Sequence, residues 1–159
     1  MKIYLLIILS FGIACLGGAV PSLSADKAYW QIAQAPKDNS LIAATLRGNV
    51  GDVVHLLSRG ADPDHHDARR NTALIYAARD GRVEIARALL KGGADPGWID
   101  GERVTALILA AFKGHPDIVK LLLNRKVDRG HRDQWGRTAL DYALRRGDAD
   151  PIAVLLRLP

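Results

Sequence analysis

Residues 72–96 read TALIYAARDGRVEIARALLKGGADP and residues 105–129 read TALILAAFKGHPDIVKLLLNRKVDR, so one pattern returns after 33 positions. The threonine-alanine-leucine that opens both segments appears again at residues 138–140, another 33 positions on. Further columns keep this interval: glycine at 48, 81, 114 and 147, paired leucines at 56–57, 89–90, 122–123 and 155–156, and Gly-Ala-Asp-Pro at 60–63 and 93–96. Several columns in register at one period indicate a repeat protein, because chance reproduces one column far more easily than all of them.

Each period contains the signals of two short helices. Thr72 offers a side-chain oxygen to the free N–H groups at the start of a first helix, and Gly81 permits the left-handed conformation that ends it. A second helix follows with Ile85 and Leu89 on one apolar stripe, until Gly93 ends it in the same way. One such pair cannot bury its stripe alone, so the sequence predicts an all-α solenoid that is stabilised by stacked neighbours.

The pattern resembles that of the ankyrin-repeat family. Threonine, leucine and paired alanines, then glycine, paired leucines and Gly-Ala-Asp follow in the family's order over residues 38–159. The resemblance implies about four helix-turn-helix repeats joined by extended turns, at about 38–66, 67–99, 100–132 and 133–159. It also implies a protein that binds a partner rather than one that catalyses a reaction.

The chain departs from the family pattern at three kinds of position. The usual proline after each threonine is alanine at 73, 106 and 139, and the usual histidine two positions later is Ile75, Ile108 and Asp141. We expect the loss of that histidine to weaken the hydrogen bonds that cap the first helices. Lys126 stands where Gly60 and Gly93 stand, which asks a residue with a side chain for a left-handed conformation at about 1 kcal/mol. We therefore expect an irregular link between the third and fourth repeats.

Both ends of the array carry features of capping repeats. In the first repeat Asn39 takes the place of the threonine as the predicted helix cap, and Asp52 occupies a normally apolar column. Residues 26–37 precede the array, and we expect 26–35 to form a helix that ends at Pro36 and covers the open end of the stack. The fourth repeat stops directly after its second helix, so we expect a truncated C-terminal cap.

Residues 1–25 have the layout of a cleavable secretory signal peptide. A lysine at position 2 precedes an apolar run, and small residues lead to a predicted cleavage site at 24–26. We therefore expect a periplasmic or secreted protein, and the arginine-rich composition favours a bacterial source. Two alternatives stay open: an uncleaved membrane anchor, and a membrane-anchored lipoprotein through Cys15, although Gly12 stands where the lipoprotein motif has leucine. Cleavage near Ala25 removes Cys15, the single cysteine, and leaves a product without thiols.

Charge and composition do not favour a nucleic-acid-binding protein. The formal net charge is +5 over 159 residues, falling to +4 once Lys2 is removed, and the arginines are spread along the chain rather than clustered. A charged fraction of 25% beside 48% hydrophobic residues is typical of an ordinary folded globular protein rather than a disordered tail.

The sequence shows no catalytic constellation and predicts neither a metal nor a cofactor. It contains no glycine-rich phosphate loop, no nucleophile elbow and no cysteine pair. His65 and His131 share one column of the repeat with Trp98, but two repeats separate the histidines by roughly 20 Å, too far to share one ion. We therefore expect a protein that is not an enzyme.

The resemblance implies that partners bind on the concave face, along the turn tips and the exposed ends of the first helices. Phe112 and Trp135 fall at columns that face solvent there, and aromatic and arginine side chains often dominate binding energy. We expect this face to bind an acidic protein surface, with the chain alone a monomer, no nucleic acid bound and no membrane span after signal cleavage. The alternative is that both rings only cover their own turn and the neighbouring helix. The candidate partner-binding residues are Arg69, Asn71, Arg79, Asp80, Glu102, Val104, Phe112, Lys113, Trp135, Arg137, Arg145 and Arg146.

Small exported bacterial ankyrin-repeat proteins include accessory factors that support a partner enzyme, and one such type is associated with periplasmic catalase in oxidative-stress defence. The resemblance therefore implies an accessory role for a periplasmic enzyme such as catalase. The alternative is an immunity protein that neutralises a toxin acting in the periplasm. Both roles require only an export signal and a concave binding face.

Overall fold

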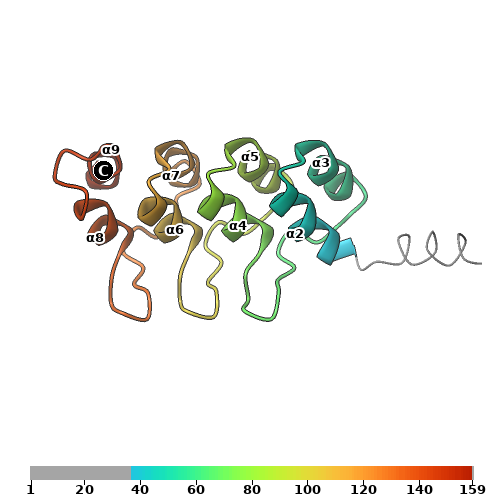
Figure 1. Ribbon diagram of the computed structural model, residues 1–159, viewed down its shortest axis with the longest axis horizontal. Coiled ribbons are helices and arrows are strands. Elements are labelled where there is room, and N and C mark those ends of the chain that lie inside the picture. The colour runs from blue at the N-terminus through green and yellow to red at the C-terminus, as the bar shows by residue number, and fades with distance from the viewer. Residues whose placement is uncertain (1–36, 159) are drawn as a thin grey trace, which may run out of the picture. The chain divides into compact units, whose positions relative to one another are not determined.

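The protein folds as a row of helix pairs joined by extended turns (Figure 1). The computed structural model describes residues 37–158, with side chains from residue 41 onward. Four helix pairs follow one another in this part of the chain: α2 (Lys37–Arg47) with α3 (Val50–Ser58), α4 (Ala73–Asp80) with α5 (Val83–Lys91), α6 (Ala106–Lys113) with α7 (Pro116–Leu123), and α8 (Ala139–Leu144) with α9 (Pro151–Arg157). The predicted all-α repeat solenoid is confirmed.

The helices form two rows. The first helices of the pairs, α2, α4, α6 and α8, form an inner row from which the turns project, and α3, α5, α7 and α9 form the outer row (Figure 1). We call the surface made by the first helices and the turns the inner face. The predicted signal peptide at 1–25, with Cys15, and the capping helix expected at 26–35 lie outside the described residues. Between residues 37 and 158, none of the helices has the length and apolar character that crossing a membrane requires.

The predicted helix signals are confirmed in the second and third repeats. Thr72 Oγ1 accepts a hydrogen bond from the N–H of Ile75 at 3.4 Å, and Thr105 caps α6 in the same way. Gly81 ends α4 with a φ of 70° and Gly114 ends α6 with a φ of 80°. Both angles lie in the left-handed region that favours glycine, so these residues fix the length of the first helices.

The core lies between the two rows. The paired alanines of the inner helices are fully buried, at Ala77, Ala78, Ala110 and Ala111. Their small size lets neighbouring inner helices approach closely, as predicted. The stripe of α5 is buried as well, with Ile85 and Leu89 at most 2% exposed. Because truncating such a leucine to alanine costs about 2–5 kcal/mol, the stacked core is the main source of stability.

Polar side chains tie each repeat to the end of the preceding inner helix. The bonds run from Arg82 to Leu46 O (2.9 Å), from His115 Nε2 to Arg79 O (3.1 Å) and from Arg146 Nη1 to Phe112 O (3.3 Å). The last carbonyls of a helix have no partner within the helix. Side chains of the next repeat satisfy them, so each repeat fixes the end of the one before it.

Backbone hydrogen bonds join the turns in the same direction. The N–H of Gly101 donates to Arg69 O at 2.9 Å, and the N–H of Gln134 donates to Glu102 O at 3.2 Å. Each acceptor lies in the turn of the preceding repeat. The turns of the inner face are therefore held at fixed positions relative to one another.

The link between the third and fourth repeats is irregular, as predicted. Lys126 adopts a left-handed conformation with a φ of 55°, where Gly60 and Gly93 have 80° and 96°. Helix α7 ends at Leu123, one position before the residue that matches Lys91, the last residue of α5. A shorter helix and a left-handed lysine therefore coincide at this link.

The predicted cap of the first repeat is wrong. Asn39 lies inside α2, because this helix begins at Lys37. The observed side-chain cap in this repeat is Asn49, whose Oδ1 accepts a hydrogen bond from the N–H of Asp52 at 3.1 Å at the start of α3.

The sequence predicts weakened capping of the first helix at Asp141, and this prediction is wrong because a full cap forms there. The carboxylate of Asp141 accepts hydrogen bonds from the N–H and the hydroxyl of Thr138, at 2.8 and 2.9 Å, while Thr138 Oγ1 accepts from the N–H of Asp141. The two residues make a capping box. The bonds from Thr138 lower the pKa of Asp141 below its ordinary value. The aspartate thus supplies hydrogen bonds that the isoleucines of the other repeats cannot.

The second helix of the fourth repeat is shifted by one residue. The buried residues are Ile118, Val119 and Leu122 in α7 and Ile152, Ala153 and Leu156 in α9, an interval of 34 rather than 33. Leu156 takes the place of Leu122, so the predicted equivalence of Leu155 with Leu122 is wrong. The strict period ends at Gly147, because the loop between α8 and α9 accommodates the extra residue.

Candidate binding surface

The predicted binding residues lie on the inner face at four recurring positions of the repeat. These are the turn tip (Arg69, Glu102, Trp135), the residue before the threonine (Asn71, Val104, Arg137), and two neighbouring positions at the end of the first helix (Arg79, Phe112, Arg145 and Asp80, Lys113, Arg146). The structure places nine of the twelve around two adjacent pockets. Asp80, Lys113 and Arg146 line neither pocket.

The larger of these two pockets lies between the third and fourth repeats and has a volume of about 280 Å³. We call it the aromatic pocket; it is lined by Glu102, Val104, Ile108, Leu109, Phe112, Trp135, Arg137, Tyr142 and Arg145. A smaller pocket of about 160 Å³ lies between the second and third repeats, and Arg69, Asn71, Tyr76 and Arg79 contribute to its walls. Glu102 and Leu109 line both, so the two pockets share one wall.

Two large aromatic side chains stand at the aromatic pocket. Phe112 is 48% exposed and Trp135 is 55% exposed, as predicted for solvent-facing columns. Phe112 also packs edge-on against the buried ring of Tyr142, with 5.2 Å between the ring centroids. Val104, predicted on the same face, lines the pocket but is only 6% exposed, because it belongs to the buried core.

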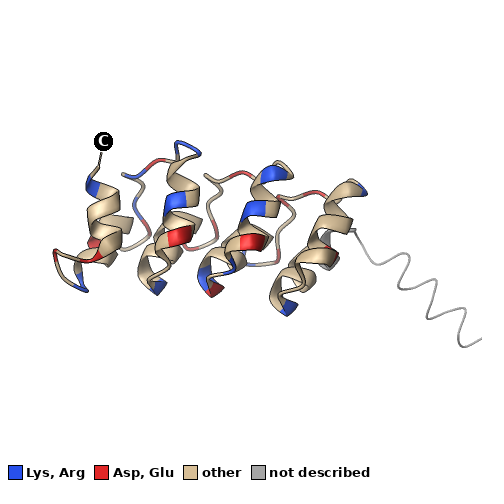
Figure 2. Ribbon diagram, turned by 90° about the horizontal axis from the view of Figure 1, so that it is seen from above, with Lys and Arg blue, Asp and Glu red and all other residues tan. Residues whose placement is uncertain are grey.

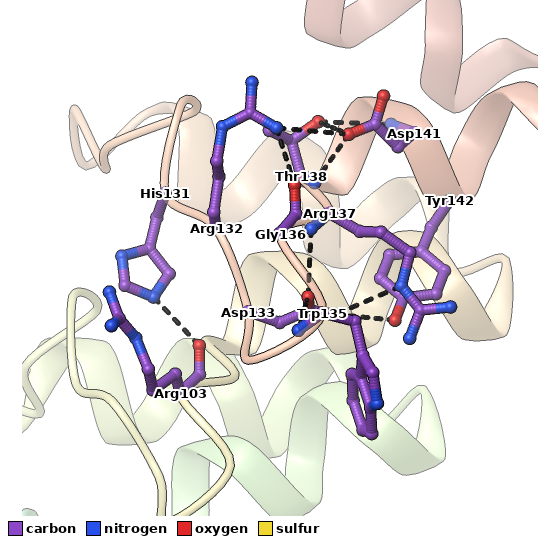
Figure 3. A network of polar contacts seen from close by, with 10 residues as sticks. All are labelled: Arg103, His131, Arg132, Asp133, Trp135, Gly136, Arg137, Thr138, Asp141 and Tyr142. Carbon is purple, nitrogen blue, oxygen red and sulfur yellow. Dashed lines mark hydrogen bonds and ion pairs between the residues drawn. The ribbon is translucent and has the colours of Figure 1, made fainter.

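A buried carboxylate organises the fourth turn. The side chain of Asp133 is fully buried and accepts hydrogen bonds from the Tyr142 hydroxyl at 2.6 Å and from the N–H groups of Trp135 and Arg137 at 2.9 and 3.0 Å (Figure 3). Burial alone would raise the pKa of Asp133, but these bonds and the nearby Arg137 charge hold it below its ordinary value. The carboxylate is therefore ionised near neutral pH, and it fixes both ends of a short turn.

Arg137 sets the position of the exposed tryptophan. Its guanidinium carbon lies 4.7 Å from the ring centroids of both Trp135 and Tyr142, and its Nε lies 3.6 Å from Asp133 Oδ2 (Figure 3). A guanidinium at this distance from a ring is attracted by the ring's quadrupole. Trp135 thus packs on its own turn and still leaves more than half of its surface open.

The second repeat contains a related arrangement. The Tyr76 hydroxyl donates to Asp67 Oδ2 at 2.6 Å, and the Arg79 guanidinium carbon lies 4.7 Å from the Tyr76 ring centroid. Burial raises the pKa of Asp67, but hydrogen bonds from Tyr76, Asn71 and Arg69 outweigh it and leave that pKa lowered. The third repeat has Leu109 in place of the tyrosine, so the apolar stretch of the inner face lies between two tyrosine-aspartate pairs.

Fewer of the basic side chains on the inner face are unpaired than the sequence suggests. Basic residues occur on every helix pair (Figure 2), but several are paired with carboxylates: Arg79 with Asp80 (2.7 Å), Arg137 with Asp133 (3.6 Å) and Arg146 with Asp150 (2.7 Å). The hydrogen bonds from Arg79 lower the pKa of Asp80. Three candidate cations, Arg69, Lys113 and Arg145, make no ion pair with a carboxylate of the described residues.

Six pocket residues were outside the sequence-based prediction. Ile108, Leu109 and Tyr142 line the aromatic pocket, while Ile75, Tyr76 and Asp100 line the smaller one. The sequence contains a signal for the tyrosines, since an aspartate opens each turn and a tyrosine follows nine residues later in the second and fourth repeats. That spacing has no fixed meaning along a chain, and only the folded turn brings the two side chains together.

Trp98 and His131, which share one column of the repeat with His65, connect successive turns. Trp98 Nε1 donates to Arg70 O at 2.8 Å, and His131 Nε2 lies 2.9 Å from Arg103 O in the turn before it (Figure 3). Over the part of the chain that the structure describes, no three histidine, cysteine, aspartate or glutamate side chains are grouped as metal ligands. The contacts of this column are structural links between successive turns.

Comparison with known families agrees with the geometry. The family model for ankyrin repeats (3 copies) matches residues 13–100, 40–133 and 90–158. No curated protein matches the chain at a significant level. Paired helices, projecting turns and a family match over most of the sequence establish that the chain belongs to the ankyrin-repeat family, whose repeats are protein–protein interaction modules.

Proposed function

We propose that this chain is an exported, non-catalytic protein that binds a partner protein through the aromatic pocket and its rim. Membership of the ankyrin-repeat family supports the binding role. One observation supports the location of the binding site: Phe112 and Trp135 are half-exposed aromatic rings at the mouth of a pocket. Large exposed apolar groups that surround a hollow mark interaction sites more often than they occur by accident.

Contacts around the two rings also support a binding role. Arg137 lies over the Trp135 ring, Asp133 accepts from the N–H of Trp135, and Tyr142 packs against Phe112. A surface that is already ordered loses little conformational entropy when a partner binds. Covering the open faces of Phe112 and Trp135 would then contribute about 25 cal/mol for each Å² removed from water.

A groove on the outer row is the competing location. It lies between α3 and α5, has a volume of about 450 Å³, and includes Val50, Val54 and Leu57 in its walls. It holds no aromatic ring and none of the predicted residues. Val54 is 51% exposed, which makes it a suitable control position for experiments on the aromatic pocket.

The compartment is part of the proposal. The signal-peptide layout of residues 1–25 supports export to the periplasm or outside the cell, and a lipoprotein anchored through Cys15 is the alternative. Fractionation of cells that produce the full chain distinguishes these. A soluble periplasmic or extracellular product shortened by about 25 residues supports cleavage and release, whereas a membrane-bound product that a Cys15→Ser variant releases supports the anchor.

Two roles fit a small exported binding protein. We favour an accessory factor for a periplasmic enzyme such as catalase in oxidative-stress defence, and the alternative is an immunity protein against a periplasm-acting toxin. The activity of the captured partner distinguishes the two roles. Co-purification with an enzyme whose activity is kept or raised supports the first role, and co-purification with a hydrolase whose activity is blocked supports the second.

The proposal is tested by capture from periplasmic extract. We expect the wild-type chain to retain a partner at moderate salt, and a Phe112→Ala/Trp135→Ala variant to lose at least nine-tenths of it. A Val54→Ala variant is the matched control, because it removes an exposed apolar side chain from the outer row. Far-UV circular dichroism checks that all three chains are folded. Equal capture by the double variant and the wild type would reject the aromatic pocket as the site.

A further inference from the structure

The rim of the aromatic pocket carries two charged side chains that differ in position and sign. Arg145 lies at the end of α8, is exposed, and has its guanidinium carbon 5.4 Å from the Tyr142 ring centroid. Glu102 lies in the turn of the third repeat and is also exposed. Neither makes an ion pair with a carboxylate or cation of residues 41–158. The pocket therefore has an available cation on its helix-end side and an available anion on its turn side.

The two arginines of this pocket are not equivalent. The charge of Arg137 is matched by Asp133 inside the fourth turn, whereas Arg145 is followed by Arg146 rather than by an acid. Lys113, at the end of α6, adds a second exposed cation beside Phe112, with its Nζ 5.2 Å from the ring centroid. A carboxylate from another molecule placed at the helix-end side would meet Arg145, which has no carboxylate partner among the described residues.

The size and walls of the pocket limit what enters it. Val104, Ile108 and Leu109 form an apolar part of the wall, and the volume is about 280 Å³. A helix with its side chains is about 10–12 Å across, which is too wide for such a hollow. A single apolar side chain from an extended segment has a suitable size, and an apolar wall favours it over a polar one.

We infer that the aromatic pocket recognises an extended acidic segment of the partner, with one apolar side chain in the pocket and a neighbouring carboxylate against Arg145. This inference rests on the proposed function and adds the chemistry of the bound segment. Arginine binds carboxylates through paired N–H donors in a fixed geometry, so the acid gives direction to a segment that the apolar side chain anchors. Glu102 disfavours a second acid on the turn side, so one acidic position next to the anchor is sufficient.

Selection from a library of random seven-residue peptides displayed on phage tests the inference, with the purified exported chain as bait. We expect enriched peptides to carry leucine, isoleucine, methionine or an aromatic residue within two positions of aspartate or glutamate. Enrichment of peptides without an acidic bias, or no enrichment at all, would overturn the inference.

The most enriched peptide is then synthesised with its acid intact and with the acid changed to the matching amide. By fluorescence anisotropy, we expect the amide form to bind the wild-type chain at least tenfold more weakly. We expect Arg145→Glu to bind the acid form no better than the amide form, because the introduced carboxylate repels the acid. Arg87→Glu is the control, because it makes the same charge change on the outer row and should behave like the wild type. Equal binding of acid and amide forms to the wild type would overturn the inference.

The two proposals fail in different ways. If periplasmic capture depends on Phe112 and Trp135 while the peptides show no acid preference, the partner-binding function stands and the acidic segment is wrong. If the peptides behave as expected while capture does not depend on these rings, the pocket binds acidic segments but the natural partner binds elsewhere.

Discussion

The second and fourth repeats contain the same polar unit and use it differently. In both, a tyrosine hydroxyl donates to the aspartate that opens the turn at 2.6 Å, in Asp67 with Tyr76 and in Asp133 with Tyr142. What surrounds the unit differs, because Asn71 of the second repeat corresponds to Arg137 of the fourth. The comparison shows that these two repeats keep the same hydrogen bond in the turn and vary the side chains around it.

The two repeats also differ in whether the arginine at the end of the first helix is paired with a carboxylate. Arg79 at the end of α4 is neutralised by its neighbour Asp80 at 2.7 Å. The corresponding Arg145 of the fourth repeat has Arg146 as its neighbour, and Arg146 binds Asp150 instead. The same helix-end position therefore presents a satisfied cation in one repeat and an available cation in the other.

Removal of each aspartate in turn has the largest expected effect on stability. We expect Asp133→Ala to lower the free energy of unfolding by about 3 kcal/mol. Removal of the buried carboxylate leaves the Tyr142 hydroxyl and two backbone N–H groups without their acceptor. Asp67 is only half-buried, so Asp67→Ala should cost about 1–2 kcal/mol. Urea unfolding followed by circular dichroism measures both. A larger loss for Asp67→Ala would reverse the assignment of the fourth turn as the more tightly organised one.

Acid stability tests the same units through their pKa values. The pKa values of Asp133 and Asp67 are lowered in the folded protein. Their contribution to stability is complete above the ordinary aspartate pKa of about 3.9 and is lost as the pH falls below it, toward the folded-state value. Tyr142→Phe removes a hydrogen bond that lowers the pKa of Asp133, so this variant should lose less stability between about pH 4 and pH 2 than the wild type does.

Urea unfolding at a series of pH values measures that slope. Tyr76→Phe is the matched variant in the second repeat. It should also flatten the acid dependence, because the Tyr76 hydroxyl lowers the pKa of Asp67. An unchanged slope in both variants would show that the tyrosine hydroxyls do not control these carboxylates.

The smallest expected effect concerns the satisfied cation. Asp80→Asn removes the partner of Arg79, and because both side chains are partly exposed, the free energy of unfolding should fall by less than about 1 kcal/mol. The variant makes the second repeat resemble the fourth by leaving its helix-end arginine available. Thermal unfolding measures the change, and a loss above about 2 kcal/mol would mean that the pair is a structural element rather than a surface ion pair.

Local signals were readable from the sequence, and contacts between distant residues were not. Thr72, Gly81 and Lys126 each act on the backbone next to them, so a residue type at one position was enough to predict a cap, a helix end and a left-handed link. The one-residue shift of Leu156 escaped prediction because the leucine pair still fits the period of 33 residues. The inserted residue becomes visible only when the buried positions of α7 and α9 are compared.

The candidate site shows the same division. Phe112 and Trp135 were predicted at exposed columns and are exposed. The burial of Val104 in the core and the contribution of Tyr142 to the pocket depend on contacts in the folded chain, which the residue pattern alone does not specify. Which arginines carry available charge also depended on side-chain partners in the folded protein, as Arg137 and Arg145 show.

Site-specific photocrosslinking tests the central claim, that partners bind at the aromatic pocket, most directly. A photoreactive phenylalanine analogue at position 135 is compared with the same analogue at position 54 on the outer row, in cells that export the chain. We predict a discrete partner adduct from position 135 and none from position 54. An adduct from position 54 with none from position 135 would contradict the account and move the binding site to the outer groove.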